Sequence, residues 1–99
     1  MSATTEVLLE SGYNSADELV QDWVLMIALS KIEQYQAECE FFEKKYGAKF
    51  NDVEQQAHKE TGAESFQQEE DLEDWEFANK ALGWWQTQVK ELGNVAANA

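Results

Sequence analysis

The stretch SADELVQDWVLMIALSKIEQYQAECEFFEKKYG, residues 15–47, decides the fold of this chain. It begins with Ser15 three positions before Glu18, which is the capping-box pattern of a helix start. It ends with two lysines and then Gly47, a pattern typical of a helix end. Because no proline interrupts it, the stretch predicts one helix near residues 16–46, about 46 Å long at about 1.5 Å per residue.

Apolar residues follow two different patterns along this predicted helix. From Leu25 onward they alternate three and four positions apart, which is the spacing of a narrow seam facing one partner helix. The seam comprises Leu25, Ala28, Ile32, Tyr35, Cys39, Phe42 and Tyr46. Between Leu19 and Leu29, by contrast, apolar residues lie almost all the way round the helix. We expect this N-terminal half to be covered on more than one side, because a single partner helix covers only one.

A short connector helix and a second long helix are predicted after Gly47. Asn51 caps the connector helix, which runs to about Lys59 before Gly62 breaks it. Its inner face comprises Phe50, Val53 and Ala57. This spacing predicts a connector that packs one side against the long helices.

The second long helix is predicted over residues 71–92. Another pattern like a capping box, Ser65 to Gln68, precedes it, and Lys90 with Gly93 closes it. Its seam comprises Trp75, Ala78, Leu82, Trp85, Val89 and Leu92, and a second stripe comprises Phe77, Ala81 and Trp84. Like the first long helix, it therefore has two apolar sides.

These elements predict an all-α fold, a long helical hairpin with a short connector helix. The hairpin domain spans residues 15–93, after a loose lead-in over residues 1–14 and before a frayed tail over residues 94–99. Each long helix keeps apolar residues that its mate does not cover. They are Trp23, Val24 and Ile27 on the first helix and Phe77 and Trp84 on the second. Since an aromatic side chain buries about 150–250 Å², we expect dimerisation into a four-helix bundle. The alternative is a monomer in which the lead-in, through residues 7–9, and the connector helix cover both stripes.

The charge of the chain limits the partners that it can bind. Twenty acidic residues oppose seven lysines and no arginine, giving a formal net charge of −13. Nucleic-acid backbones and anionic membranes bind clustered basic residues, so we expect neither as a direct partner. A basic protein partner is favoured instead, through electrostatic steering. The alternative interpretation is that the charge only keeps an apolar-rich protein soluble.

Targeting and membrane-spanning segments are not predicted. The first ten residues lack a basic segment followed by an apolar run, so we expect no secretory signal. The longest apolar run, residues 23–29, is too short to span a bilayer. We therefore expect a cytoplasmic protein.

No catalytic residue, cofactor or metal is predicted. Cys39 is the one cysteine and His58 the one histidine, which is too few for a zinc site. Any nucleophilic triad would depend on that same histidine. A lone histidine on a connector helix is more typical of a surface residue, and a thiol beside Phe41 and Phe42 is typical of a buried one.

An acidic run lies ahead of Trp75 at the start of the second long helix. It contains Glu69, Glu70, Asp71, Glu73 and Asp74. Three interpretations stay open: a solvated first turn favoured by the helix dipole, a contact for a basic partner, and a site for a hard cation. The run resembles the Glu-Glu-x-x-Glu half of the all-helical MazG-type nucleotide pyrophosphatases, but no Glu-x-x-Asp follows on a later helix. The rival hypothesis, a metal-dependent enzyme of that type, would use Glu40, Glu43, Glu70, Glu73 and Asp74.

A second resemblance concerns the segment EFFEKKYG at residues 40–47, then Phe50, and the acidic run that ends in Asp74-Trp75-Glu76. Over residues 19–92 the chain resembles the small acidic helical antitoxins of prokaryotic toxin–antitoxin pairs. The resemblance implies a protein that neutralises a toxin by binding it. This chain departs from many antitoxins in lacking a basic DNA-binding segment, which puts repression of its own operon in doubt.

The leading hypothesis is therefore a non-enzymatic protein-binding module, a homodimer that also engages a basic partner. Its interface candidates are the five uncovered apolar residues and the five residues of the acidic run. The pyrophosphatase-like enzyme is the rival, and a purely structural, self-associating protein is the third alternative.

Overall fold

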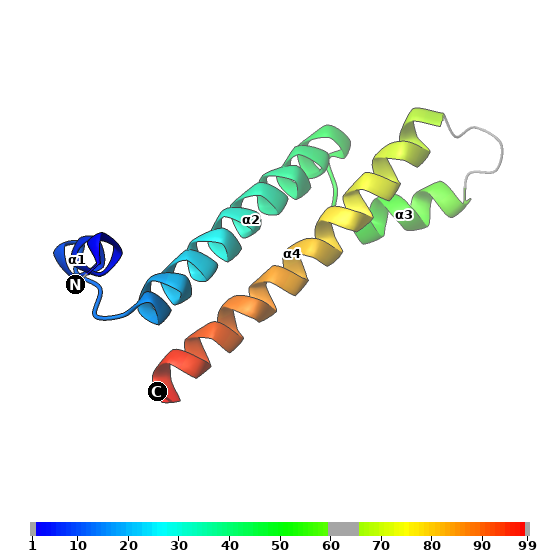
Figure 1. The fold of residues 1–99 in the computed structure, drawn as a ribbon. Coiled ribbons are helices and arrows are strands. Elements are labelled where there is room, and N and C mark those ends of the chain that lie inside the picture. The colour runs from blue at the N-terminus through cyan, green and yellow to red at the C-terminus, as the bar shows by residue number, and fades with distance from the viewer. Residues whose placement is uncertain (1, 60–65, 99) are drawn as a thin grey trace.

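The computed structural model describes residues 2–59 and 66–98 of the chain (Figure 1). Every regular element in these two ranges is a helix, so the all-α prediction is confirmed for them. The helices are α1, Ala3–Glu10; α2, Ala16–Tyr46; α3, Phe50–Lys59; and α4, Phe66–Asn98. No helix in the described ranges has both the length and the hydropathy needed to cross a membrane.

Helix α2 has the predicted bounds, because both of its ends are specified by local chemistry. The Ser15 side chain accepts a hydrogen bond from the Glu18 backbone N–H at 3.3 Å. In return the Glu18 carboxylate accepts from the backbone N–H of Asn14 at 2.8 Å. At the other end Gly47 adopts the left-handed conformation, with φ of 65°, and donates to the Glu43 carbonyl.

The first residues differ from the predicted loose lead-in, since Ala3–Glu10 forms helix α1. Ser2 caps it by accepting a hydrogen bond from the Thr5 N–H at 3.2 Å. None of its residues is buried, so the apolar residues 7–9 do not dock on the core. Sequence periodicity missed this helix because it has no partner face, and a local cap is all that marks its start.

Helices α3 and α4 are longer than predicted. Helix α3 begins at Phe50, and α4 spans Phe66–Asn98 where we predicted a helix over residues 71–92. The chain therefore stays helical through Gly93, whose φ is not positive, and through the segment that we expected to be frayed. A glycine ends a helix when it adopts the left-handed conformation, and Gly93 does not. The predicted break at Gly62 and cap at Ser65 lie outside the described residues.

The hairpin is closed by a small aromatic core where α2, α3 and α4 meet. Its buried residues are Cys39, Phe42, Val53, Trp75 and Ala78. Trp75 is 1% exposed and stacks on two rings of α2. Its ring centroid lies 5.7 Å from that of Phe42 and 5.9 Å from that of Tyr46. Phe50 from α3 meets the same indole edge-on at 5.4 Å. We call this region the closed end.

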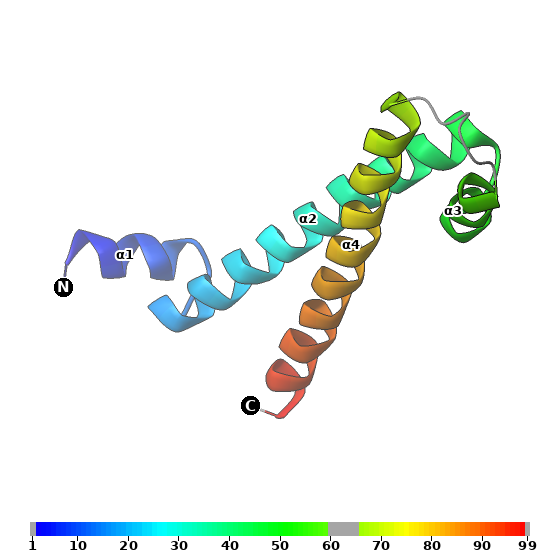
Figure 2. The same cartoon turned by 90° about the vertical axis from the view of Figure 1, so that its right-hand side faces the viewer.

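The other end of the hairpin is open. Figure 2 shows α2 crossing α4 in the N-terminal half of α4, so that the start of α2 and the end of α4 separate. The chain measures 69 × 27 × 17 Å and has a radius of gyration of 20.4 Å. A compact chain of this length would have a radius of about 13 Å. The molecule is therefore elongated, and we call the splayed half the open end.

Candidate functional site

One continuous apolar face covers the N-terminal half of α2 at the open end. Leu19, Val20, Trp23, Val24 and Ile27 line a shallow hollow of about 280 Å³, which we call the open-end face. These positions recur at helical spacing, so their side chains form a single stripe. Trp23 is 63% exposed, and Val20, Val24 and Ile27 are exposed as well. Met26 and Leu29, on other sides of the same turns, are also exposed.

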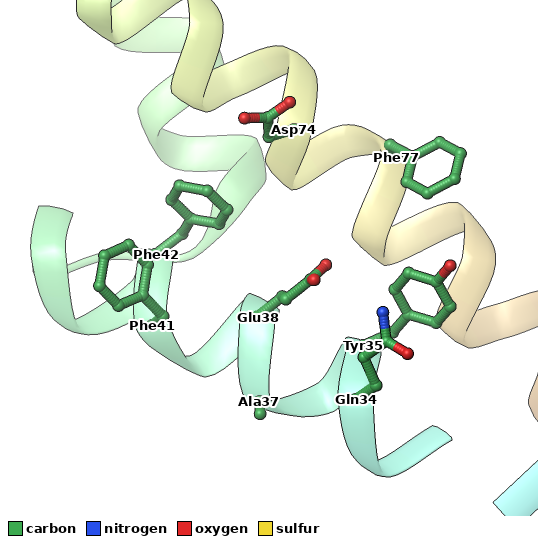
Figure 3. A pocket seen from close by; sticks show the side chains of 8 residues that line it. All are labelled: Gln34, Tyr35, Ala37, Glu38, Phe41, Phe42, Asp74 and Phe77. Atoms are coloured by element: carbon green, nitrogen blue, oxygen red, sulfur yellow. The ribbon is translucent and has the colours of Figure 1, made fainter. Parts of the chain in front are cut away.

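The apolar candidates on α4 lie in two separate places. Trp84 is 56% exposed and packs edge-on against Trp85, with ring centroids 4.8 Å apart. Phe77 lies further toward the closed end and contacts Tyr35 of α2 edge-on at 5.9 Å (Figure 3). The structure therefore places Trp23, Val24 and Ile27 together on one face, with Trp84 and Phe77 apart from it.

Four members of the acidic run are exposed, as a partner contact requires. Glu69, Glu70, Glu73 and Asp74 all lie on the surface of α4. Glu69 and Glu73 border a hollow of about 340 Å³ that also contains His58 of α3. The lone histidine thus lies on the surface among carboxylates.

Asp71, the fifth member of the run, is a different kind of residue. It is 6% exposed, and its carboxylate accepts hydrogen bonds from Lys45 and Tyr46 at 2.5 Å and from Gln67 at 3.1 Å. Burial by itself raises the pKa of Asp71, but these hydrogen bonds and the charge of Lys45 hold that pKa below its ordinary value. Asp71 therefore joins the end of α2 to the start of α4 and is buried in the single chain, unlike the four exposed members of the run.

The carboxylates of the rival enzyme hypothesis do not converge. No three histidine, cysteine, aspartate or glutamate side chains within the described part of the chain form a group that could hold a metal ion. Glu43, one of the residues required, instead pairs with Lys49 at 3.2 Å. The geometry therefore offers this hypothesis no support.

Cys39 lies in the closed-end core. Its Sγ donates a hydrogen bond to the Asn79 side-chain oxygen at 3.1 Å, across α2 and α4. Burial raises the pKa of the Cys39 thiol, and the nearby charges of Glu43, Glu38 and Glu40 raise it further. The thiol therefore stays protonated and packs as a small apolar group.

A groove between α2 and α4 was not predicted from the sequence. It has a volume of about 540 Å³. Gln34, Tyr35, Ala37, Glu38, Phe41, Phe42, Asp74 and Phe77 line it. Figure 3 shows two aromatic pairs at its sides and two carboxylates between them. The sequence signal was present in the off-seam Phe41 and Phe77, but their alignment depends on how the two helices are paired.

Comparison of the chain with protein families, with curated proteins and with solved structures finds no match. The functional argument therefore depends on the surfaces described above.

Proposed function

We propose that this chain is a non-enzymatic protein-binding module whose open-end face is covered by another polypeptide. The observation that carries the proposal is the exposure of Trp23 together with Val20, Val24 and Ile27 on one stripe. Burying apolar area yields about 25 cal/mol per Å², and tryptophan is the residue type most enriched at binding hot spots. A contiguous exposed apolar stripe is thus what a binding surface requires.

The first occupant that we propose is a second copy of the chain. Two hairpins related by a two-fold axis would place one open-end face against the other and complete a four-helix bundle. The position of this face supports the arrangement, because Val20, Trp23, Val24 and Ile27 remain exposed on α2 while Ala28, on the side of α2 that carries the seam, is buried. Trp84 on the C-terminal arm would then join the same apolar interior.

The second occupant that we propose is a basic protein in the cytoplasm, neutralised as a toxin is by an antitoxin. The first thirty residues contain five carboxylates and no lysine or arginine. Asp17, Glu18 and Asp22 therefore flank the open-end face without a basic neighbour in sequence before Lys31. Such a border favours a partner that presents apolar residues surrounded by lysine or arginine.

The test is the mass of the chain in solution at micromolar concentration, by sedimentation equilibrium. We expect a species of twice the 11.3 kDa chain mass, reduced to the single chain mass in the variant Trp23→Ser with Ile27→Ser. The matched control, Val7→Ser with Leu9→Ser, removes two exposed apolar side chains from α1 and should leave the dimer intact.

The outcomes of this test separate the two occupants. A single-chain mass with no binding of a hydrophobic dye would overturn the protein-binding proposal as a whole. A single-chain mass with dye binding that is lost in the Trp23 and Ile27 variant would overturn the dimer and favour the basic partner.

A further inference from the structure

The groove between α2 and α4 is walled by two pairs of aromatic rings. Phe41 and Phe42 meet edge-on with ring centroids 5.3 Å apart, and Tyr35 and Phe77 do the same at 5.9 Å. Phe42 is buried beside Phe41, whereas Phe41 and Phe77 are exposed, and we call these two exposed rings the rims of the groove. An aromatic face attracts a cation through its quadrupole, and pairs of rings on two sides can enclose one.

Two carboxylates lie between these aromatic walls. Figure 3 shows the Glu38 side chain extending from α2 toward α4, where Asp74 lies on the facing helix. Both side chains are exposed, and neither forms a hydrogen bond or ion pair with any group that the structure describes. No lysine is among the lining residues. The groove therefore combines aromatic walls with two negative charges that have no cation within the described chain.

This combination matches the binding chemistry of a guanidinium group. Arginine stacks its planar group on aromatic rings and presents a fork of donors to carboxylates, whereas a lysine ammonium is a compact and more strongly hydrated charge. A bare metal ion is disfavoured, because no group of three ligating side chains is present among the described residues. A second copy of the chain cannot supply the ligand either, since the sequence contains no arginine.

We infer that this groove, lined by Tyr35, Glu38, Phe41, Phe42, Asp74 and Phe77, binds an arginine side chain presented by a basic protein partner. The guanidinium enters between the Phe41 and Phe77 rims, and Glu38 and Asp74 accept its hydrogen bonds. This inference goes beyond the proposed occupants of the open-end face, because it concerns a second binding surface. It uses a surface distinct from the open-end face, so the chain can hold a second copy and an arginine-bearing partner at the same time.

The experiment is a titration of the ¹⁵N-labelled full chain with Nα-acetyl-arginine amide, followed by amide chemical shifts. We expect shifts centred on residues 34–42 and 74–77, weakened by added salt. The neutral isostere Nα-acetyl-citrulline amide should produce none of them, and Nα-acetyl-lysine amide should bind several-fold more weakly. The citrulline and lysine comparisons use the unaltered chain, so they do not depend on how any variant folds.

The matched variants test the two carboxylates. Glu38→Gln with Asp74→Asn should weaken arginine binding by roughly fivefold to tenfold, as expected for two partly solvated charge contacts. Glu6→Gln with Glu10→Gln makes the same change of net charge on α1 and should leave binding unchanged. Phe77→Ala should weaken binding by roughly threefold through loss of one rim.

Three results would overturn the inference: shifts spread evenly over the acidic surface, equal affinity for arginine and lysine probes, or equal loss in both double-carboxylate variants. None of these results changes the mass or the dye binding of the chain, which report on the open-end face. Failure of the arginine groove is therefore distinguishable from failure of the proposed function.

Discussion

The two ends of the hairpin use the same residue type in opposite ways. At the closed end Trp75 is buried, and at the open end Trp23 is exposed. Trp75 lies on the seam that faces the partner helix, whereas Trp23 lies on the second apolar side of α2. Trp75 contacts rings from α2 and from α3, whereas Trp23 is left 63% exposed. An apolar helix is covered on two sides only where three elements meet.

Polar contacts sharpen the same contrast. At the closed end one buried carboxylate, Asp71, receives hydrogen bonds from Lys45, Tyr46 and Gln67 and joins α2 to α4. At the open end the Tyr13 hydroxyl donates to Asp22 at 2.8 Å, in an exposed position. We therefore expect the closed end to account for most of the stability of the single chain, and the open end for its binding.

Of the substitutions that test this comparison, Trp75→Ala should change the stability of the chain most. Removing a fully buried tryptophan from a core costs about 3–5 kcal/mol of unfolding free energy. Urea denaturation followed by circular dichroism measures it. The matched control is Trp84→Ala on the same helix, measured at a concentration where the chain is a monomer; it should cost about 1 kcal/mol or less because Trp84 is exposed in the single chain. Equal losses in the two variants would remove the distinction between the ends.

Asp71→Asn should have the next largest effect, about 1–2 kcal/mol near neutral pH. The substitution leaves Lys45 and Tyr46 facing an amide in place of a charge, and the 40% exposure of the Lys45 side chain limits the loss through solvent screening. Glu73→Gln, two positions away on the surface, is the control and should change stability little.

The stabilisation that Asp71 and Tyr46 provide should depend on pH, and it should be lost in both acid and alkali. Because the pKa of Asp71 is held below its ordinary value of 3.8, the stabilisation is present above that value and is lost as pH falls through the folded-state pKa. Burial and the hydrogen bond to Asp71 raise the pKa of Tyr46 to about 12, so its stabilisation is present below pH 10 and lost as pH rises toward 12. The advantage of the unaltered chain over Asp71→Asn should therefore shrink in acid. A constant difference between pH 7 and pH 2 would contradict this role for Asp71.

The sequence predicts those features of the two ends that depend on residues close together in the chain, and it misses those that depend on residues far apart. The bounds of α2 were predicted correctly because Ser15, Glu18 and Gly47 act within one turn of the helix end. Asp71 was grouped with its exposed neighbours because nothing in the acidic run distinguishes it; Lys45 and Tyr46, which bury it, lie 26 and 25 positions earlier. The arginine groove depends on Glu38 of α2 lying opposite Asp74 of α4. An amphipathic pattern predicts which side of each helix is apolar, but it does not predict which residues of the two helices lie opposite one another.

Gly83→Ala should have the smallest effect, and its direction is opposite. A Cβ built on Gly83 meets no described atom within 4 Å, so alanine fits without displacing a neighbour. Since glycine inside a helix costs about 1 kcal/mol relative to alanine, the variant should be more stable by up to that amount. The reverse substitution at the closed end, Ala78→Gly, should lose at least as much, because Ala78 is fully buried in the core. Both changes can be read from urea midpoints at a concentration where the chain is a monomer. A less stable Gly83→Ala monomer would mean that a helix already packs closely there, and the open end would then be closed in the single chain.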